Sequence, residues 1–204
     1  MKKIMFNDKY GLTQAVLEGR KTQTRRTFLK PGEDTLLNGI TPQYLISVRS
    51  RYKVGETVAI AQKYEDLIKN DEFYRLGGKN GMPLECIKYE RGCHNKMFVR
   101  AELMPHHIRI TKIRMERLQD ISDEDCLKEG ICRSDIKNAL WGVAPIRGEG
   151  ESGTTYEHSV LGYGPWHLFP SVKRAYASLI DRISGKGTWA SNPYVFVYDF
   201  ELID

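Results

Sequence analysis

The sequence has few cysteines and no long apolar run. Four of its 204 residues are cysteine, and no two of them form a C-x-x-C pair: Cys86, Cys93, Cys126 and Cys132. A disulfide framework is therefore not expected, and reduced thiols are predicted. No stretch approaches the roughly 18 consecutive apolar residues that a membrane-spanning helix requires. The first eight residues turn polar too early for a secretion signal, so we expect a cytoplasmic protein with no membrane partner.

The sequence also lacks internal repeats and low-complexity tracts. A chain of 204 residues with 41% hydrophobic content can bury a core without a disulfide or a metal. We predict one domain over residues 1–204, with insertions at about 65–100 and 140–165. The first insertion is polar and is expected to contain one hairpin, and the second is a glycine-rich loop. No cofactor is expected.

The positive charge is unevenly distributed. The net charge is +5, but residues 1–30 hold eight basic and two acidic side chains, so the rest of the chain is slightly acidic. A local excess of this kind favours an anionic partner for one segment. A solvated basic face explains the charge equally well.

The first 65 residues predict three strands and one helix. Ile4–Phe6 reads as a strand, followed by a helix that begins at Asn7 or Asp8 and ends near Glu18. Gly19 suits the left-handed position that closes such a helix. Two further strands are predicted over 44–48 and 57–62, where β-branched and aromatic residues gather.

The second half predicts long strands and capped helices. A strand runs to about Leu118, and its apolar phase shifts between residues 110 and 113, which predicts a bulge. Ser122 and Ser171 are predicted to cap helices that end near residues 129–130 and at Gly185. A short helix is predicted over 134–141. Asn192 then opens a last strand whose alternating aromatic side chains we assign to the core. Together these elements predict an α+β fold around a small barrel.

Residues 19–26 concentrate the candidate chemistry, with four cations, two threonines and a glutamine. We expect this segment to be exposed after the helix. Alternate residues of an extended segment share a face. The two predicted faces are Thr22, Thr24 and Arg26 on one side, and Lys21, Gln23 and Arg25 on the other; a bend at the helix exit would instead bring Lys21 toward Thr24. Arginine forks and hydroxyls bind phosphate oxygens well. A desolvated lysine can act as a base toward a threonine or a water.

Gly19, Lys21 and Arg26 match the G-x-K-x-x-x-x-R signature of the ASCH domain, a branch of the PUA-like fold. Other segments resemble the family in the same order: Tyr52–Glu56, Arg117–Ser122 with Glu129–Ile131, and Gly185–Val197. The resemblance is closest to the longer, phage-borne members and covers residues 3–28, 52–62, 104–131 and 171–202. It implies a PUA-like barrel with a cleft beside the first helix.

The resemblance implies two functions, and both remain open. One is binding of RNA or a nucleotide in the cleft. The other is an amidohydrolase that deacylates a modified nucleoside such as acetylcytidine. In that enzyme Lys21 is the base, Thr24 or its activated water is the nucleophile, and Glu129 carries the proton to the leaving amine. The residues expected to contact the substrate are Gly19, Arg20, Thr22, Arg25, Arg26, Gln62 and Trp189. Gln62 departs from the family, whose longer members place a glutamate near this position.

Three other patterns carry less weight. Cys86, Cys93, His94, His106 and His107 include zinc-ligand types, but their spacing matches no recognised zinc motif. Residues 185–188 read Gly-Lys-Gly-Thr without the first glycine of a P-loop. Trp189 and Trp166 are candidates to stack on a base. A third reading remains, in which the cleft of a mobile-element accessory protein binds another ligand. The sequence does not predict the oligomeric state.

Overall fold

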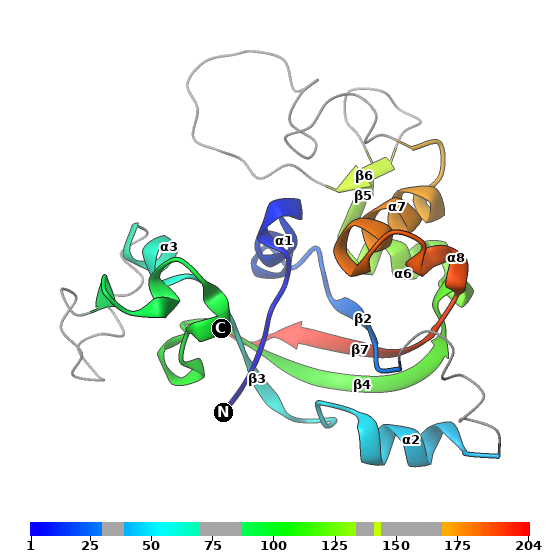
Figure 1. Ribbon diagram of the computed structural model, residues 1–204, viewed down its shortest axis with the longest axis horizontal. Helices are drawn as coiled ribbons and strands as arrows, with labels where there is room; N and C mark the ends of the chain where they lie inside the picture. Colours follow the sequence, from blue (N-terminus) through cyan, green and yellow to red (C-terminus); the bar gives the residue numbers. More distant parts are fainter. Residues whose placement is uncertain (30–38, 70–86, 134–140, 144–168) are drawn as a thin grey trace.

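The computed structural model describes residues 1–29, 39–69, 87–133, 141–143 and 169–204 (Figure 1). Five strands form one mixed sheet in the order β1-β3-β4-β7-β2, in which β1 and β3 are parallel and the other neighbours antiparallel. The strands are β1 (Lys2–Ile4), β2 (Gln23–Thr27), β3 (Thr57–Ile60), β4 (His107–Arg117) and β7 (Tyr194–Leu202). The predicted α+β class is confirmed. Among the described strands no pairing joins β1 to β2, so the sheet is not a closed barrel.

The β4–β7 ribbon is the longest pairing in the sheet. The register between the two strands shifts between Ile110 and Lys112. This shift confirms the bulge predicted from the change of apolar phase, because an extra residue moves the following side chains to the other face. β4 curves along the sheet, and both β2 and β3 pair with this ribbon (Figure 1).

Helices lie on both sides of the sheet, with α1, α6 and α7 on one side and α2 on the other (Figure 1). The α-helices are α1 (Leu12–Leu17), α2 (Pro42–Arg49), α3 (Tyr64–Lys69), α6 (Asp123–Lys128), α7 (Val172–Ser184) and α8 (Thr188–Ser191). Short 3₁₀ turns are η1 (Asp8–Tyr10), η3 (Arg91–Cys93), η4 (Lys96–Phe98), η5 (Ala101–Leu103) and η6 (Leu118–Asp120). A separate pair of strands joins β5 (Ile131–Arg133) to β6 (Trp141–Val143).

The predicted caps of α6 and α7 are confirmed. The Ser122 hydroxyl accepts the backbone N–H of Asp125, and the Ser171 hydroxyl accepts that of Arg174. A side-chain acceptor at this position satisfies a backbone donor that the helix leaves unpaired. Helix α7 then packs one apolar stripe into the core and ends before Gly185. No helix in the described part of the chain is long and apolar enough to cross a membrane.

The strand predicted over 44–48 is wrong, because these residues belong to α2. The Thr41 hydroxyl accepts the N–H of Tyr44, and Pro42 occupies the first turn. Proline fits this place because its missing N–H has no helical partner there. The predicted first helix is split into η1 and α1 at Gly11.

The two predicted insertions are only partly described. Residues 65–69 and 87–100 hold part of α3 and the turns η3 and η4, and contain no strand of the predicted hairpin. The prediction for 134–141 falls mostly outside the described residues, although Trp141 begins a strand rather than ending a helix. Residues 144–168, which include Trp166, and residue 86 also lie outside them.

Candidate functional site

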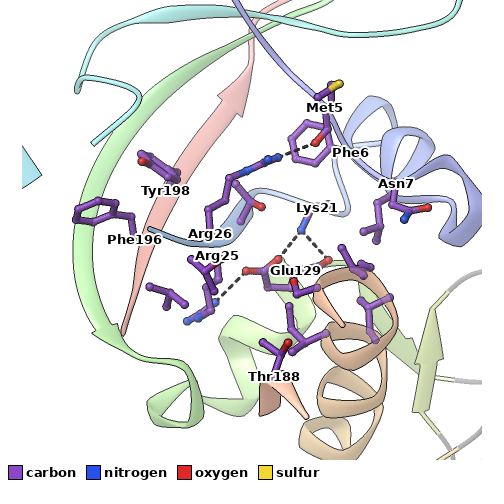
Figure 2. Close-up of a pocket in the computed structure, with 18 of the residues that line it drawn as sticks. Met5, Phe6, Asn7, Lys21, Arg25, Arg26, Glu129, Thr188, Phe196 and Tyr198 are labelled. Carbon is purple, nitrogen blue, oxygen red and sulfur yellow. Dashed lines mark hydrogen bonds and ion pairs between the residues drawn. The ribbon is translucent and has the colours of Figure 1, made fainter. Parts of the chain in front are cut away.

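A cavity of about 910 Å³ lies beside β2 (Figure 2). Its walls come from segments that are far apart in the sequence: the link from β1 to α1, strand β2, the end of α2, residues 94–96, helix α7 and strand β7. Among the described residues that line it, eight are basic, two are acidic and five are aromatic. The cavity is therefore large enough for a small organic ligand and strongly cationic.

Strand β2 faces two environments. In the antiparallel pair with β7, Thr24 lies opposite Tyr198 and Arg26 opposite Phe196, and all four line the cavity. The neighbouring Gln23 and Arg25 point to the other face of the strand, as the predicted alternation requires, although Arg25 also borders the cavity.

Lys21 and Glu129 form a buried ion pair next to the cavity. The Lys21 ammonium lies 2.5 Å from Glu129 Oε2 and also donates to the backbone carbonyls of Gln23 at 2.7 Å and Glu129 at 2.9 Å. The two side chains are 2% and 6% exposed. Burial lowers the pKa of Lys21 from its ordinary value, and Glu129 opposes that shift. Because all three N–H groups have acceptors, this geometry holds an ammonium rather than a free amine.

Local backbone geometry brings this pair together. Gly19 has φ +71° and Gly130 has φ +98°, so both occupy conformations that other residues rarely adopt. Gly19 ends α1 and Gly130 ends α6, which turns Lys21 and Glu129 toward each other. The N–H of Thr22 donates to the carbonyl of Lys128 and joins the two turns.

Residues 21–25 are not exposed as predicted. Lys21, Gln23, Thr24 and Arg25 are all buried. The prediction failed because Lys21, Gln23 and Arg25 find polar partners on β4, β7 and in or directly after α6, from 91 to 176 residues further along the chain.

Arg25 lies in an ionic network, which we call the Arg25 cluster; its members are Gln23, Arg25, Arg114, Glu116, Asp125 and Asp199. Arg25 donates to Glu116 at 2.7 Å and to Asp125 at 3.0 Å, and it also reaches Glu129 Oε1 at 3.2 Å. Burial disfavours the guanidinium charge, but Glu129 and the neighbouring carboxylates together raise the pKa of Arg25 above its ordinary value. Arg25 therefore orients Glu129 (Figure 2), and its guanidinium is paired with protein carboxylates although the residue also borders the cavity.

Arg26 points the other way, toward Met5 and Phe6 (Figure 2). Its Nη2 donates to the Met5 carbonyl at 2.6 Å, whereas its buried Nε has no hydrogen-bond partner. Burial lowers the pKa of Arg26, Tyr52 opposes the shift and the nearby charge of Arg51 adds to it. Arg20 and Gln62 also have a buried polar atom without a partner, but of these three residues only Arg26 lines the cavity.

Aromatic side chains line the same cavity. The Phe6 ring lies 5.8 Å from Lys21 Nζ and 5.9 Å from the Arg26 guanidinium. Phe28 and Phe196 are stacked with their centroids 4.0 Å apart. Tyr176 is buried and its hydroxyl has no hydrogen-bond partner among the described residues. Flat apolar faces beside cations are typical of sites that bind bases.

Five predicted contact residues do not line the cavity: Gly19, Arg20, Thr22, Gln62 and Trp189. Arg20 pairs with Glu18 at 2.5 Å, and Trp189 packs edge-on against Tyr176 while its backbone N–H donates to Asp181. Arg20 and Trp189 therefore make structural contacts in the described part of the chain. The buried carboxamide oxygen of Gln62 has no partner there.

Sequence reasoning missed lining residues that include Phe6, Lys96, Tyr176 on α7, Arg49 at the end of α2 and Arg51 just after it. Lys96 donates to Asp8 at 2.6 Å and so ties residues 94–96 to the chain before α1. Arg49 and Arg51, close before Tyr52, were a sequence signal for further cations at the site. The incorrect strand over 44–48 gave no reason to place them there.

The described residues contain no group of three or more His, Cys, Asp or Glu side chains arranged to hold a metal. Cys93 is buried, and His94 lies 2.8 Å from Glu65. Searches against family models, curated proteins and solved structures find no match to this chain.

Proposed function

We propose that the chain binds a nucleotide unit, of RNA or of a free nucleotide, in the cavity beside β2. The observation that carries this proposal is the joint lining of one cavity by a cationic excess and by aromatic faces. Cations complement phosphate, and aromatic rings stack on bases. The ASCH-like signature agrees with the proposal, because Lys21 and Arg26 both line this cavity and Gly19 has a positive φ. We also propose that the five-stranded sheet is a version of the PUA-like fold.

Titration calorimetry with nucleotides and short oligoribonucleotides tests the proposal. Arg26→Ala is expected to weaken binding about tenfold or more, because a charge-assisted hydrogen bond to a buried donor is lost. Arg109→Ala is the matched control: this arginine is half exposed, pairs only weakly with Glu201 at 3.5 Å and lies outside the cavity. Binding is also expected to weaken with added salt. Failure of the folded protein to bind any nucleotide or oligoribonucleotide would refute the proposal.

Amide hydrolysis is a second candidate function, favoured by the convergence of Lys21, Glu129 and Thr24 at the same cavity. The structure describes no hydrogen bond to the Thr24 hydroxyl, so this group is available to a ligand or a water. In such a reaction water adds to the acyl carbon and gives a proton to the Glu129 carboxylate, the C–N bond breaks, and the Lys21–Glu129 pair passes that proton to the leaving amine. Acetylcytidine and water would give cytidine and acetic acid, which ionises to acetate.

A chromatographic assay of acetylcytidine hydrolysis tests this candidate. Thr24→Val removes the hydroxyl with little change of shape and is expected to abolish turnover, whereas Thr24→Ser retains the hydroxyl and part of the activity. Hydrolysis that is unchanged in Thr24→Val would exclude the proposed role of this residue. A wild-type protein that binds acetylcytidine without cleaving it would leave binding as the function.

A further inference from the structure

Three arginines from separate segments of the chain line the cavity. Arg26 comes from β2, Arg49 from the last turn of α2, and Arg51 from the segment that follows this helix. The backbone N–H of Arg51 donates to the Tyr198 hydroxyl at 3.3 Å, and Tyr198 is the register partner of Thr24 on β7. Arg51 therefore lies beside a residue that lines the same cavity, and its nearby charge contributes to the lowered pKa of Arg26.

The described residues provide no carboxylate partner for these three guanidinium groups. Arg51 stacks over Tyr52 at 5.7 Å, and Arg26 donates only to a backbone carbonyl. Lys21 and Arg25, in contrast, are fully paired with Glu129 and the Arg25 cluster. Arg49 also suits the negative end of α2, but this effect does not explain the positions of Arg26 and Arg51. The unsatisfied Nε of Arg26 is a second, independent sign of a missing acceptor.

We propose that Arg26, Arg49 and Arg51 form a subsite for a phosphomonoester, so that the preferred ligand is a nucleoside 5′-monophosphate. This inference rests on the proposed function and specifies its ligand. A phosphomonoester carries about −1.5 to −2 charges at pH 7, more than the single charge of a phosphodiester. Guanidinium groups also match its oxygens in geometry, since each presents several fixed N–H donors. The base would lie toward Phe6 and the other aromatic faces of the cavity.

The test compares each of the four common ribonucleosides with its 5′-monophosphate by titration calorimetry. The wild-type protein is expected to bind at least one monophosphate about tenfold or more tightly than the matching nucleoside. In the Arg49→Ala/Arg51→Ala double variant this preference should fall to about twofold, while nucleoside affinity stays the same. Both side chains are exposed and have no ion pair in the described part of the chain, so the variant is expected to fold. Arg109→Ala again serves as the control, and inorganic phosphate should compete with the monophosphate.

The outcomes separate the subsite from the proposed function. Equal binding of nucleoside and monophosphate, or a preference that survives in the double variant, overturns the phosphate subsite and leaves nucleotide-unit binding standing. Absence of all binding overturns both. A further arm compares 5′-phosphorylated with 5′-hydroxyl hexaribonucleotides. Selective binding of the 5′-phosphorylated oligomer supports the phosphate subsite and identifies an RNA end as the source of the phosphate. Equal binding of the two oligomers, with no binding of mononucleotides, overturns the phosphate subsite.

Discussion

The Lys21–Glu129 pair gives the sharpest test of the structure. Glu129→Gln keeps the shape of the side chain and removes its charge. Arg25 retains Glu116 and Asp125, but Lys21 loses its carboxylate partner and keeps only neutral acceptors, two backbone carbonyls and the amide oxygen of the new side chain. Removing one partner of a buried ion pair typically costs about 3–5 kcal/mol. Because Arg25 remains paired, we expect the lower end, about 3 kcal/mol, which in a chain of this size lowers Tm by roughly 6–12 °C.

Urea unfolding followed by circular dichroism measures this change. The matched control is Glu201→Gln, whose partner Arg109 is 3.5 Å away and half exposed, so that its loss should cost no more than about 1 kcal/mol. A double-mutant cycle with Lys21→Met isolates the interaction, because removing both charges should cost less than the sum of the single changes. A Glu129→Gln variant within about 0.5 kcal/mol of the wild type would show that the buried pair is not charged.

The cost of Glu129→Gln is also expected to depend on pH. Burial lowers the pKa of Lys21 and Glu129 opposes this lowering, so the substitution should lower it further. In the variant the unfolded chain then binds more protons than the folded chain between the lowered pKa and the ordinary value near 10.5. Its stability therefore rises with pH through that window, and the difference from the wild type shrinks. A difference that stays constant from pH 7 to pH 10 would contradict this account.

Two other predictions follow from buried groups. Gly130→Ala places a Cβ 3.4 Å from Leu12 at φ +98°, and this backbone strain should lower stability by about 1–2 kcal/mol in urea unfolding; an unchanged midpoint would contradict it. Burial raises the pKa of the Cys126 thiol to about 12, so iodoacetamide at pH 8 should modify Cys126 far more slowly in the folded protein than in urea. Peptide mass spectrometry measures the two rates, and equal rates would show that Cys126 is accessible.

Local signals in the sequence predicted much of the fold. The caps at Ser122 and Ser171 were correct, because a capping hydroxyl acts on a backbone donor only three residues away. The bulge in β4 was correct because a phase shift is visible within one strand. The apolar and β-branched residues at 44–48 favour a strand. Thr41 and Pro42 form a helix start signal, and the structure follows this signal with α2.

The site was predicted less completely, because its contacts join distant parts of the chain. Lys21, Thr24, Arg26 and Glu129 do border one cavity. The burial of the segment was missed, since the partner of Lys21 lies 108 residues away and no local pattern reveals it. The same distance effect applies to Arg25. Its positive charge predicts an anionic ligand, but its guanidinium already forms ion pairs with three carboxylates of the protein.

The alternation along β2 has a consequence for how this protein can diverge. Thr24 and Arg26 face the cavity, whereas the neighbouring Arg25 faces the ionic cluster. Substitutions at Thr24 and Arg26 can therefore change which ligand is preferred while Arg25 and its ionic cluster remain unchanged. An insertion or deletion of one residue in this strand has the opposite effect, since it would exchange the two sets of side chains and abolish both roles at once.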